Sequence, residues 1–270
     1  MTGRAALVPL VAYSLRRRRG FLISVALALA VFQFVIIFVA RSLELSGRFQ
    51  LMQGLMPDFI AEWTHMGAAS FRGFVLFGYS DPVVHVFLAA IAISVGIEPV
   101  MEIESKFVDL LMARPVARWT IVARSIVVIV FVTWIALLTM FAANEGGMLL
   151  LAPATAARPP LPVVASLATG LGFLMLAWGS IALAIASWSR RRATAGAICG
   201  FLAFAMFILD YLGRFWDPAR TLSAISPFHY FDPFGMIGGA ALQFSDVLAL
   251  VAFSVVSVIV AHVAYARRDL

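Results

Sequence analysis

The chain has 270 residues, of which 63% are apolar and only 13% are charged, and its mean hydropathy is +0.98. Too few polar side chains remain to cover a water-soluble globule of this size. A bilayer, in contrast, accepts apolar surface and requires only that backbone groups be hydrogen-bonded internally. The composition therefore excludes a soluble domain and predicts an integral membrane protein. The net charge of +6 would suggest nucleic acid for a soluble protein, but here it is explained by membrane topology, and no nucleic-acid partner is expected.

Unbroken apolar runs of helix-spanning length predict an all-α membrane protein, because the strands of a transmembrane barrel would alternate apolar and polar residues. The run at 82–97 is short, so we expect it to extend back through 74–79 or to continue into a polar helix. No internal repeat is visible, which argues against an inverted-repeat transporter and favours a single domain over residues 1–270. The six expected spans are residues 21–40, 82–97, 121–143, 161–188, 193–212 and 247–266.

Basic residues predict the orientation of these spans. Six spans place both termini on one side, and the segments on that side hold fourteen of the twenty Lys and Arg residues, including the run Arg16 to Arg19. Since the Lys and Arg bias of short loops sets orientation, we expect both termini in the cytoplasm of a multi-pass cell-membrane protein. Arg124, near the start of the third span, is expected to reach the membrane surface with its long side chain.

The segment between the second and third spans, Glu98 to Trp119, has the pattern of an amphipathic cytoplasmic helix. Phe107 and Leu111 lie on one side of it, while Glu102 and Lys106 form a favourable i,i+4 pair on the other. Pro115 is expected to end this helix. A plain interfacial helix that only caps the bundle remains an alternative.

The outer segment 213–245 is too long for a turn and is rich in aromatic residues interrupted by prolines. Such a segment is typical of short helices that dip into the outer leaflet, where protein buries the non-spanning backbone. A plain interfacial belt of aromatic residues is the alternative.

Together these segments resemble the permease subunits of type-2 ATP-binding-cassette (ABC) exporters. The inner segment VDLLMARPVAR, residues 108–118, is similar to the family's LDLLLxxPVSR, and Glu102 and Glu104 match its acidic residues. Lys106 and Phe107 stand where the family usually has Gly-Thr. The resemblance also covers the basic N-terminal segment, the six spans, the outer SPFHYF at 226–231 and the ending Arg-Arg-Asp at 267–269.

The resemblance implies that the inner segment is a coupling helix, which docks on a separate ATPase. Its expected docking residues are Glu98, Glu102, Glu104, Phe107, Asp109, Leu111 and Arg114. It also implies that the outer segment is a re-entrant gate built around Pro227, Phe228, His229 and Tyr230.

The partners follow from the same resemblance. It implies two copies of an ATPase that binds ATP and Mg, and a second permease chain that forms a homodimer or a paired permease. It also implies contact with membrane lipids and a location in a bacterial inner membrane. This chain itself has no GxxxxGK[ST] motif, so ATP hydrolysis and its cofactors are expected in the partner.

Polar residues inside the spans are few. They either line a pathway or hydrogen-bond a neighbouring helix, and the candidates are Gln33, Ser94, Thr133 and Asn144. Asp210 is expected to pair with Arg214 four residues later.

An enzyme is not expected, because the four histidines lie at different depths and no hydrolase signature lies in a span. Asp58, Glu62 and His65 share one face of an expected amphipathic helix. We interpret this face as the solvent-exposed side of that helix rather than as a metal site, so no metal is expected. A non-transporting membrane anchor or regulatory subunit of a membrane complex is the alternative function.

Overall fold

The computed structural model describes residues 3–55, 70–105, 119–154 and 156–267. Within these ranges the protein is all-α, and six helical stretches are long and apolar enough to cross a membrane. The predicted fold class, a polytopic helical membrane protein, is confirmed. The six stretches are α2 (Arg19–Leu45), Phe71–Glu104, α9 (Trp119–Leu151), α10 (Leu161–Trp188), α11 (Arg192–Gly213) and α14 (Phe244–Arg267).

The second stretch is longer than the predicted 82–97 and consists of three helices, α5 (Phe71–Ser80), α6 (Pro82–Gly96) and α7 (Glu98–Glu104). The first break lies at Asp81, which is extended because the following Pro82 disfavours a helical residue before it. The Asp81 carboxylate accepts a hydrogen bond from the Val83 amide at 2.7 Å and so caps α6. The second span therefore extends back through α5 and forward through α7, as expected from the short length of its apolar run.

The third span is also longer than predicted, since α9 continues past Ala143 to Leu151. The predicted boundary stopped at the first polar residues, Asn144 and Glu145, but both are helical, and Asn144 is fully buried. The remaining helices are short or precede the first span: α1 (Gly3–Arg17), α3 (Arg48–Leu55), α12 (Asp217–Ser223), the 3₁₀ turn η1 (Pro227–Tyr230) and α13 (Pro233–Ile237).

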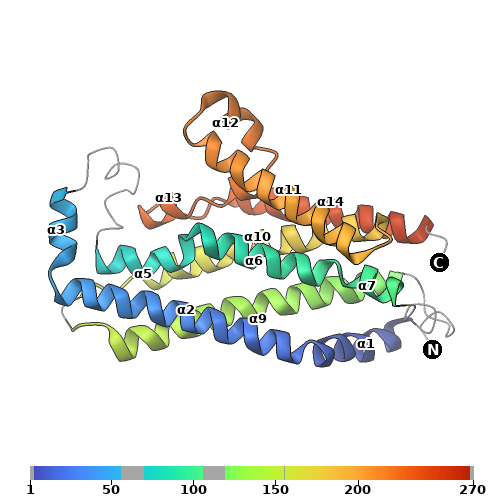
Figure 1. Ribbon diagram of the computed structural model, residues 1–270, viewed down its shortest axis with the longest axis horizontal. Coiled ribbons are helices and arrows are strands. Elements are labelled where there is room, and N and C mark those ends of the chain that lie inside the picture. The colour runs from blue at the N-terminus through green and yellow to red at the C-terminus, as the bar shows by residue number, and fades with distance from the viewer. Residues whose placement is uncertain (1–2, 56–69, 106–118, 155, 268–270) are drawn as a thin grey trace.

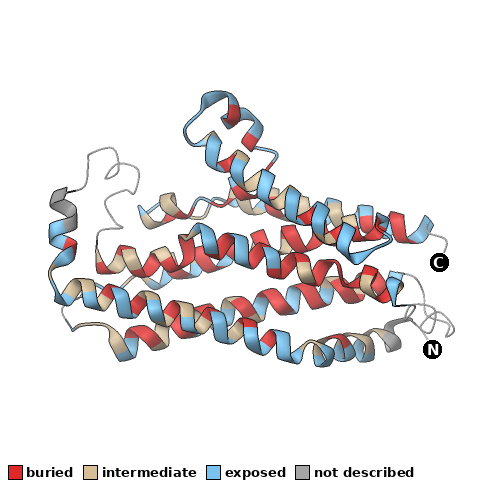
Figure 2. Ribbon diagram, viewed as in Figure 1, coloured by how far each residue is buried: buried red, intermediate tan, exposed pale blue. Residues whose placement is uncertain are grey.

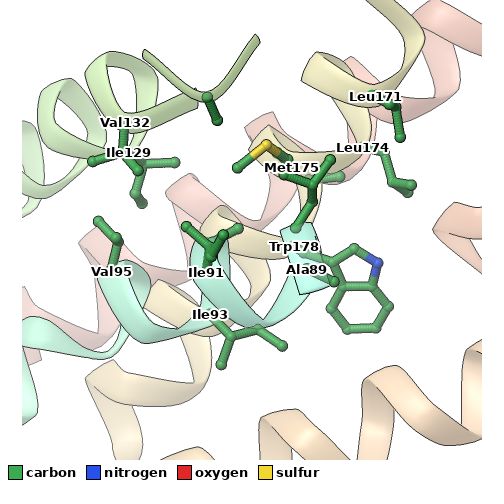
Figure 3. Close-up of a cluster of buried hydrophobic side chains, with 14 of the residues drawn as sticks. Ala89, Ile91, Ile93, Val95, Ile129, Val132, Leu171, Leu174, Met175 and Trp178 are labelled. Atoms are coloured by element: carbon green, nitrogen blue, oxygen red, sulfur yellow. The ribbon is translucent and has the colours of Figure 1, made fainter. Parts of the chain in front are cut away.

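Helix α10 forms the centre of the core and packs against α6, α9 and α14. Figure 3 shows Met175 and Trp178 of α10 beside Ile91 of α6, with Ile129 of α9 close by. Helices α6 and α10 meet closely at Gly96, where a Cβ atom would lie 2.4 Å from the Gly179 carbonyl oxygen. Small residues allow such close packing of helices in a membrane, where van der Waals contact drives association.

Both chain termini lie at the same end of the bundle, together with α7 (Figure 1). We refer to this end as the inner end, following the orientation predicted from the basic residues. We use outer end for the opposite end of the bundle together with the connection between α11 and α14, which lies beside the middle of α10 (Figure 1). Few residues of helices α11 and α14 are buried, and Figure 2 shows a wide exposed face on α11. Large apolar side chains such as Phe201 and Phe204 point outward there, as expected of a lipid-facing surface.

Candidate functional site

The inner end is held together by charged side chains. Arg18 lies at the junction of α1 and α2, and its Nε donates a hydrogen bond to the Glu98 carboxylate at 3.1 Å. The same guanidinium lies 3.5 Å from the Ser94 carbonyl oxygen near the end of α6. Glu98 is the first residue of α7 and is only 2% exposed. This contact therefore ties the start of the first span to the end of the second.

A second ion pair is more deeply buried. Arg124 of α9 donates to the Glu102 carboxylate of α7, and both side chains are 1% exposed. The expectation that Arg124 reaches the membrane surface is therefore wrong, because its charge is neutralised inside the bundle instead. A buried ion pair is costly to break, since either partner alone would leave an uncompensated charge.

Glu104 makes the third connection, because its carboxylate accepts a hydrogen bond from the Arg192 backbone amide at 3.0 Å. Arg192 begins α11, so a carboxylate also complements the positive end of that helix dipole. The seven residues of α7 thus contact the α1–α2 junction, α9 and α11. We refer to these three contacts as the inner clamp.

The inner clamp corrects part of the predicted docking surface. Glu98 and Glu102 are among the expected docking residues, but this chain buries both carboxylates. Helix α7 belongs to the second candidate span, which ends at Glu104. The other expected docking residues lie outside the described residues: Phe107, Asp109, Leu111 and Arg114. Asp58, Glu62 and His65 also lie outside them.

The outer end is held by aromatic packing around η1. The ring of Phe228 is 5.4 Å from that of Trp178 on α10 and 5.4 Å from that of Phe207 on α11. Phe228 is 4% exposed, and Pro227 before it is also buried. The Ser226 hydroxyl donates to the Met206 carbonyl at 3.0 Å and fixes the turn against α11. We refer to this arrangement as the aromatic turn.

The other two expected gate residues lie at the edge of the aromatic turn. Tyr230 donates from its hydroxyl to the Ala224 carbonyl at 2.8 Å and packs near Phe253 of α14, at 6.1 Å between ring centroids. The His229 side chain is 39% exposed, and its Nδ1 lies 3.7 Å from Asp210. Asp210 pairs with Arg214 at 3.1 Å, which confirms the predicted i,i+4 contact.

The four pathway candidates contact different neighbours. Gln33 of α2 donates to the Gly78 carbonyl of α5 at 3.2 Å, while Ser94 bonds the carbonyl of Ile91 in its own helix. Thr133 lines an apolar hollow of about 360 Å³ between α9 and α10. Asn144 is fully buried in α9. Of the four, Gln33 bonds a neighbouring helix, which is the structural role weighed for these residues at the outset, whereas Ser94 bonds its own helix.

Sequence reasoning missed the partners of the inner clamp, although one signal was present. An arginine and a glutamate that both lie at the inner edge of apolar runs are expected to form an ion pair when both are buried. Arg18 was treated only as part of a basic run. Among the residues that the structure describes, no group of three or more His, Cys, Asp or Glu side chains is arranged to hold a metal ion.

Comparison with protein-family models gives no match, and no curated protein matches the chain in sequence.

Proposed function

We propose that this chain is the membrane-spanning permease subunit of an ABC export system, which forms the translocation pathway and couples to a separate ATPase subunit. The proposal starts from the resemblance of segments 98–118 and 226–231 to that family. Six candidate spans with both termini at one end are compatible with it. Two permease chains and two ATPase subunits would form the complete assembly, with ATP and Mg bound by the ATPase.

The observation that carries the proposal is the inner clamp. Residues 106–118, which contain the family-like VDLLMARPVAR run, directly follow α7. Helix α7 is bound to the α1–α2 junction by Arg18, to α9 by Arg124 and to the start of α11 by Arg192. A force applied to 106–118 by an ATPase would therefore reach four helices through short, directional contacts.

This geometry changes the roles that we assign to the acidic residues. Glu98, Glu102 and Glu104 transmit movement by holding the neighbouring helices, while Phe107 and Leu111 are the apolar anchors of docking. Asp109 and Arg114 set the register of the docked helix, because charges at an interface rim give specificity more than affinity. The aromatic turn is the outer gate, with Phe228 as its central side chain.

Docking can be tested on the complex purified from its native membranes. Phe107→Asp and Leu111→Asp should each remove the ATPase, because an unpaired charge in a desolvated interface typically costs several kcal/mol. A photoreactive ATP analogue should label a co-purified subunit with the wild type and not with these variants. Leu149→Asp is a matched control on an exposed position at the opposite end of α9, and it should leave the labelling unchanged.

Two results would refute the proposal. Full labelling in both docking variants would show that 106–118 is an interfacial helix without a docking role. Purification of the wild-type chain without any subunit that binds ATP would instead favour a membrane anchor or regulatory subunit.

A further inference from the structure

Near the outer end, aromatic side chains from four elements enclose a cavity of about 280 Å³. Its volume is at the lower edge of the range for ligand pockets, so it suits a molecule smaller than a typical drug. Helices α5, α11 and α13 and the segment around η1 supply the rings, and His85 of α6 lies at the wall. The six rings belong to Phe77, Phe207, Tyr211, Phe228, Phe231 and Phe234.

One carboxylate, that of Asp210, lies in the wall of this aromatic cavity. Asp210 is 7% exposed, and Arg214 donates to it at 3.1 Å. The guanidinium carbon of Arg214 lies 5.9 Å from the centroid of the Phe234 ring. The protein thus already holds a cation with an aromatic face and a carboxylate, which are the two groups that recognise organic cations.

Arg214 can leave this position, because a second cavity of about 570 Å³ adjoins the first. Asp210, Arg214 and Phe234 line both cavities, so Arg214 stands at their boundary. Asp217 and Asp232 line the second cavity and offer the guanidinium other carboxylates. The Arg214 side chain is 28% exposed, and an i,i+4 ion pair of that exposure is weak.

We propose that the aromatic cavity binds a small organic cation, an ammonium that carries an aryl or branched alkyl group. Its positive charge takes the place of the Arg214 guanidinium beside Asp210, and its apolar group fills the space between the rings. Arg214 then turns into the second cavity toward Asp217 and Asp232. The proposed binding of a cation is a property of this chain alone and does not depend on the proposed export function.

The probe is radiolabelled benzyltrimethylammonium, and binding is measured by equilibrium dialysis against the full chain in lipid nanodiscs. We expect saturable binding above that of empty nanodiscs. Neopentylbenzene has the same shape without the charge, and phenylmethanesulfonate carries the opposite charge. Neither should displace the probe at concentrations at which the unlabelled ammonium does.

Two variants assign the charge recognition. Asp210→Asn should weaken binding about tenfold or more, because the ionic contact between the quaternary ammonium and the carboxylate is lost. Arg214→Gln should strengthen binding severalfold, because it removes the guanidinium that competes for Asp210 and leaves only the His229 ring near that carboxylate among the described contacts. Asp246→Asn removes an acidic side chain that lines neither cavity, at the start of α14, and should leave the affinity unchanged.

Three outcomes would overturn the proposal. Non-saturable binding would show that the cavity takes no such cation. Equal displacement by neopentylbenzene would show that the rings act without the carboxylate. Weaker binding in Arg214→Gln would show that the arginine attracts the ligand rather than competing with it. If Asp210→Asn fails to fold, two measurements still test the proposal. One compares the three compounds on the wild type, and the other compares the affinity of the Arg214→Gln variant with that of the wild type.

Discussion

The two ends of the bundle are held by different physical means. At the inner end, three carboxylates of one short helix bind an arginine side chain, a second arginine side chain and a backbone amide. At the outer end, a 3₁₀ turn is held mainly by rings, with Phe228 between Trp178 and Phe207. Ion pairs with hydrogen bonds are directional and fix one arrangement, whereas the hydrophobic effect that buries the rings is non-directional.

This difference matches what the two ends would do in a transporter. A connection that transmits force has to keep its geometry, and buried ion pairs resist separation because each partner alone would be an uncompensated charge. A gate has to open, and an apolar seal opens without leaving charges unpaired. The comparison therefore predicts that similar substitutions will have unequal effects at the two ends.

The first test is all-or-none and establishes that the two ends face opposite sides of the membrane. Ala157→Cys lies in the outer link after α9, and Ala193→Cys lies near the start of α11; both positions are exposed. A membrane-impermeant thiol reagent applied to intact cells should label Ala157→Cys and not Ala193→Cys. The native Cys199 is 1% exposed and should give little background. The reverse pattern would invert the orientation predicted from the basic residues.

The largest change in stability is expected at the inner clamp. Arg124→Gln should lower the free energy of unfolding by about 3 to 5 kcal/mol, because it leaves the buried Glu102 carboxylate unpaired. Adding Glu102→Gln should recover most of that loss, since no charge then remains buried. Unfolding of the purified protein in mixed micelles, followed by circular dichroism, measures both effects.

An exposed arginine at the same end provides the control. Arg190→Gln should change the free energy of unfolding by less than about 0.5 kcal/mol, as is usual for surface substitutions. If Arg124→Gln had as small an effect as Arg190→Gln, the ion pair would not hold α7 to α9.

The next largest loss of stability is expected from a substitution in the aromatic turn. Phe228→Ala should cost about 3 kcal/mol of local stability, because a buried ring is lost between α10 and α11. We expect higher basal ATPase activity or leak in the complex, with assembly unchanged. Tyr230→Phe removes only the hydroxyl that bonds the Ala224 carbonyl and should cost about 1 kcal/mol.

Thiol chemistry tests the same assignment directly. Phe228→Cys should react with a bulky hydrophilic reagent far more slowly than Ala157→Cys, because position 228 is 4% exposed. Equal rates, with and without trapped nucleotide, would show that the turn is open to water and is not a seal.

The sequence was sufficient for features that depend on neighbouring residues. Long apolar runs predicted the six spans, and i,i+4 spacing predicted the contact between Asp210 and Arg214. Glu98 and Arg18 are 80 residues apart, so their contact depends on how two spans are aligned along the membrane normal. Periodicity within one helix contains no information about that alignment.

Arg124 and Asn144 show a second limit. Arg124 was expected to reach the membrane surface, and the predicted third span stopped just before Asn144, yet both side chains are buried within α9. Polar residues do continue a spanning helix when another helix covers them, as Glu102 covers Arg124. Hydropathy alone therefore ended the third span too early, at Ala143 instead of Leu151.

The smallest effect is expected when the same substitution is made at the outer end. Arg214→Gln removes an ion pair of 3.1 Å, but its side chains are 28% and 9% exposed, compared with 1% for both partners of the inner pair. The outer pair lines the second cavity together with other charged and polar residues, so we expect water to screen it and the loss to stay below about 1 kcal/mol. The same unfolding measurement compares Arg214→Gln with Arg124→Gln. Because both replace an arginine with a glutamine, side-chain size contributes similarly, and the difference reports how strongly burial raises the cost of the unpaired carboxylate. Equal losses would mean that charge pairing holds the outer end as firmly as the inner end.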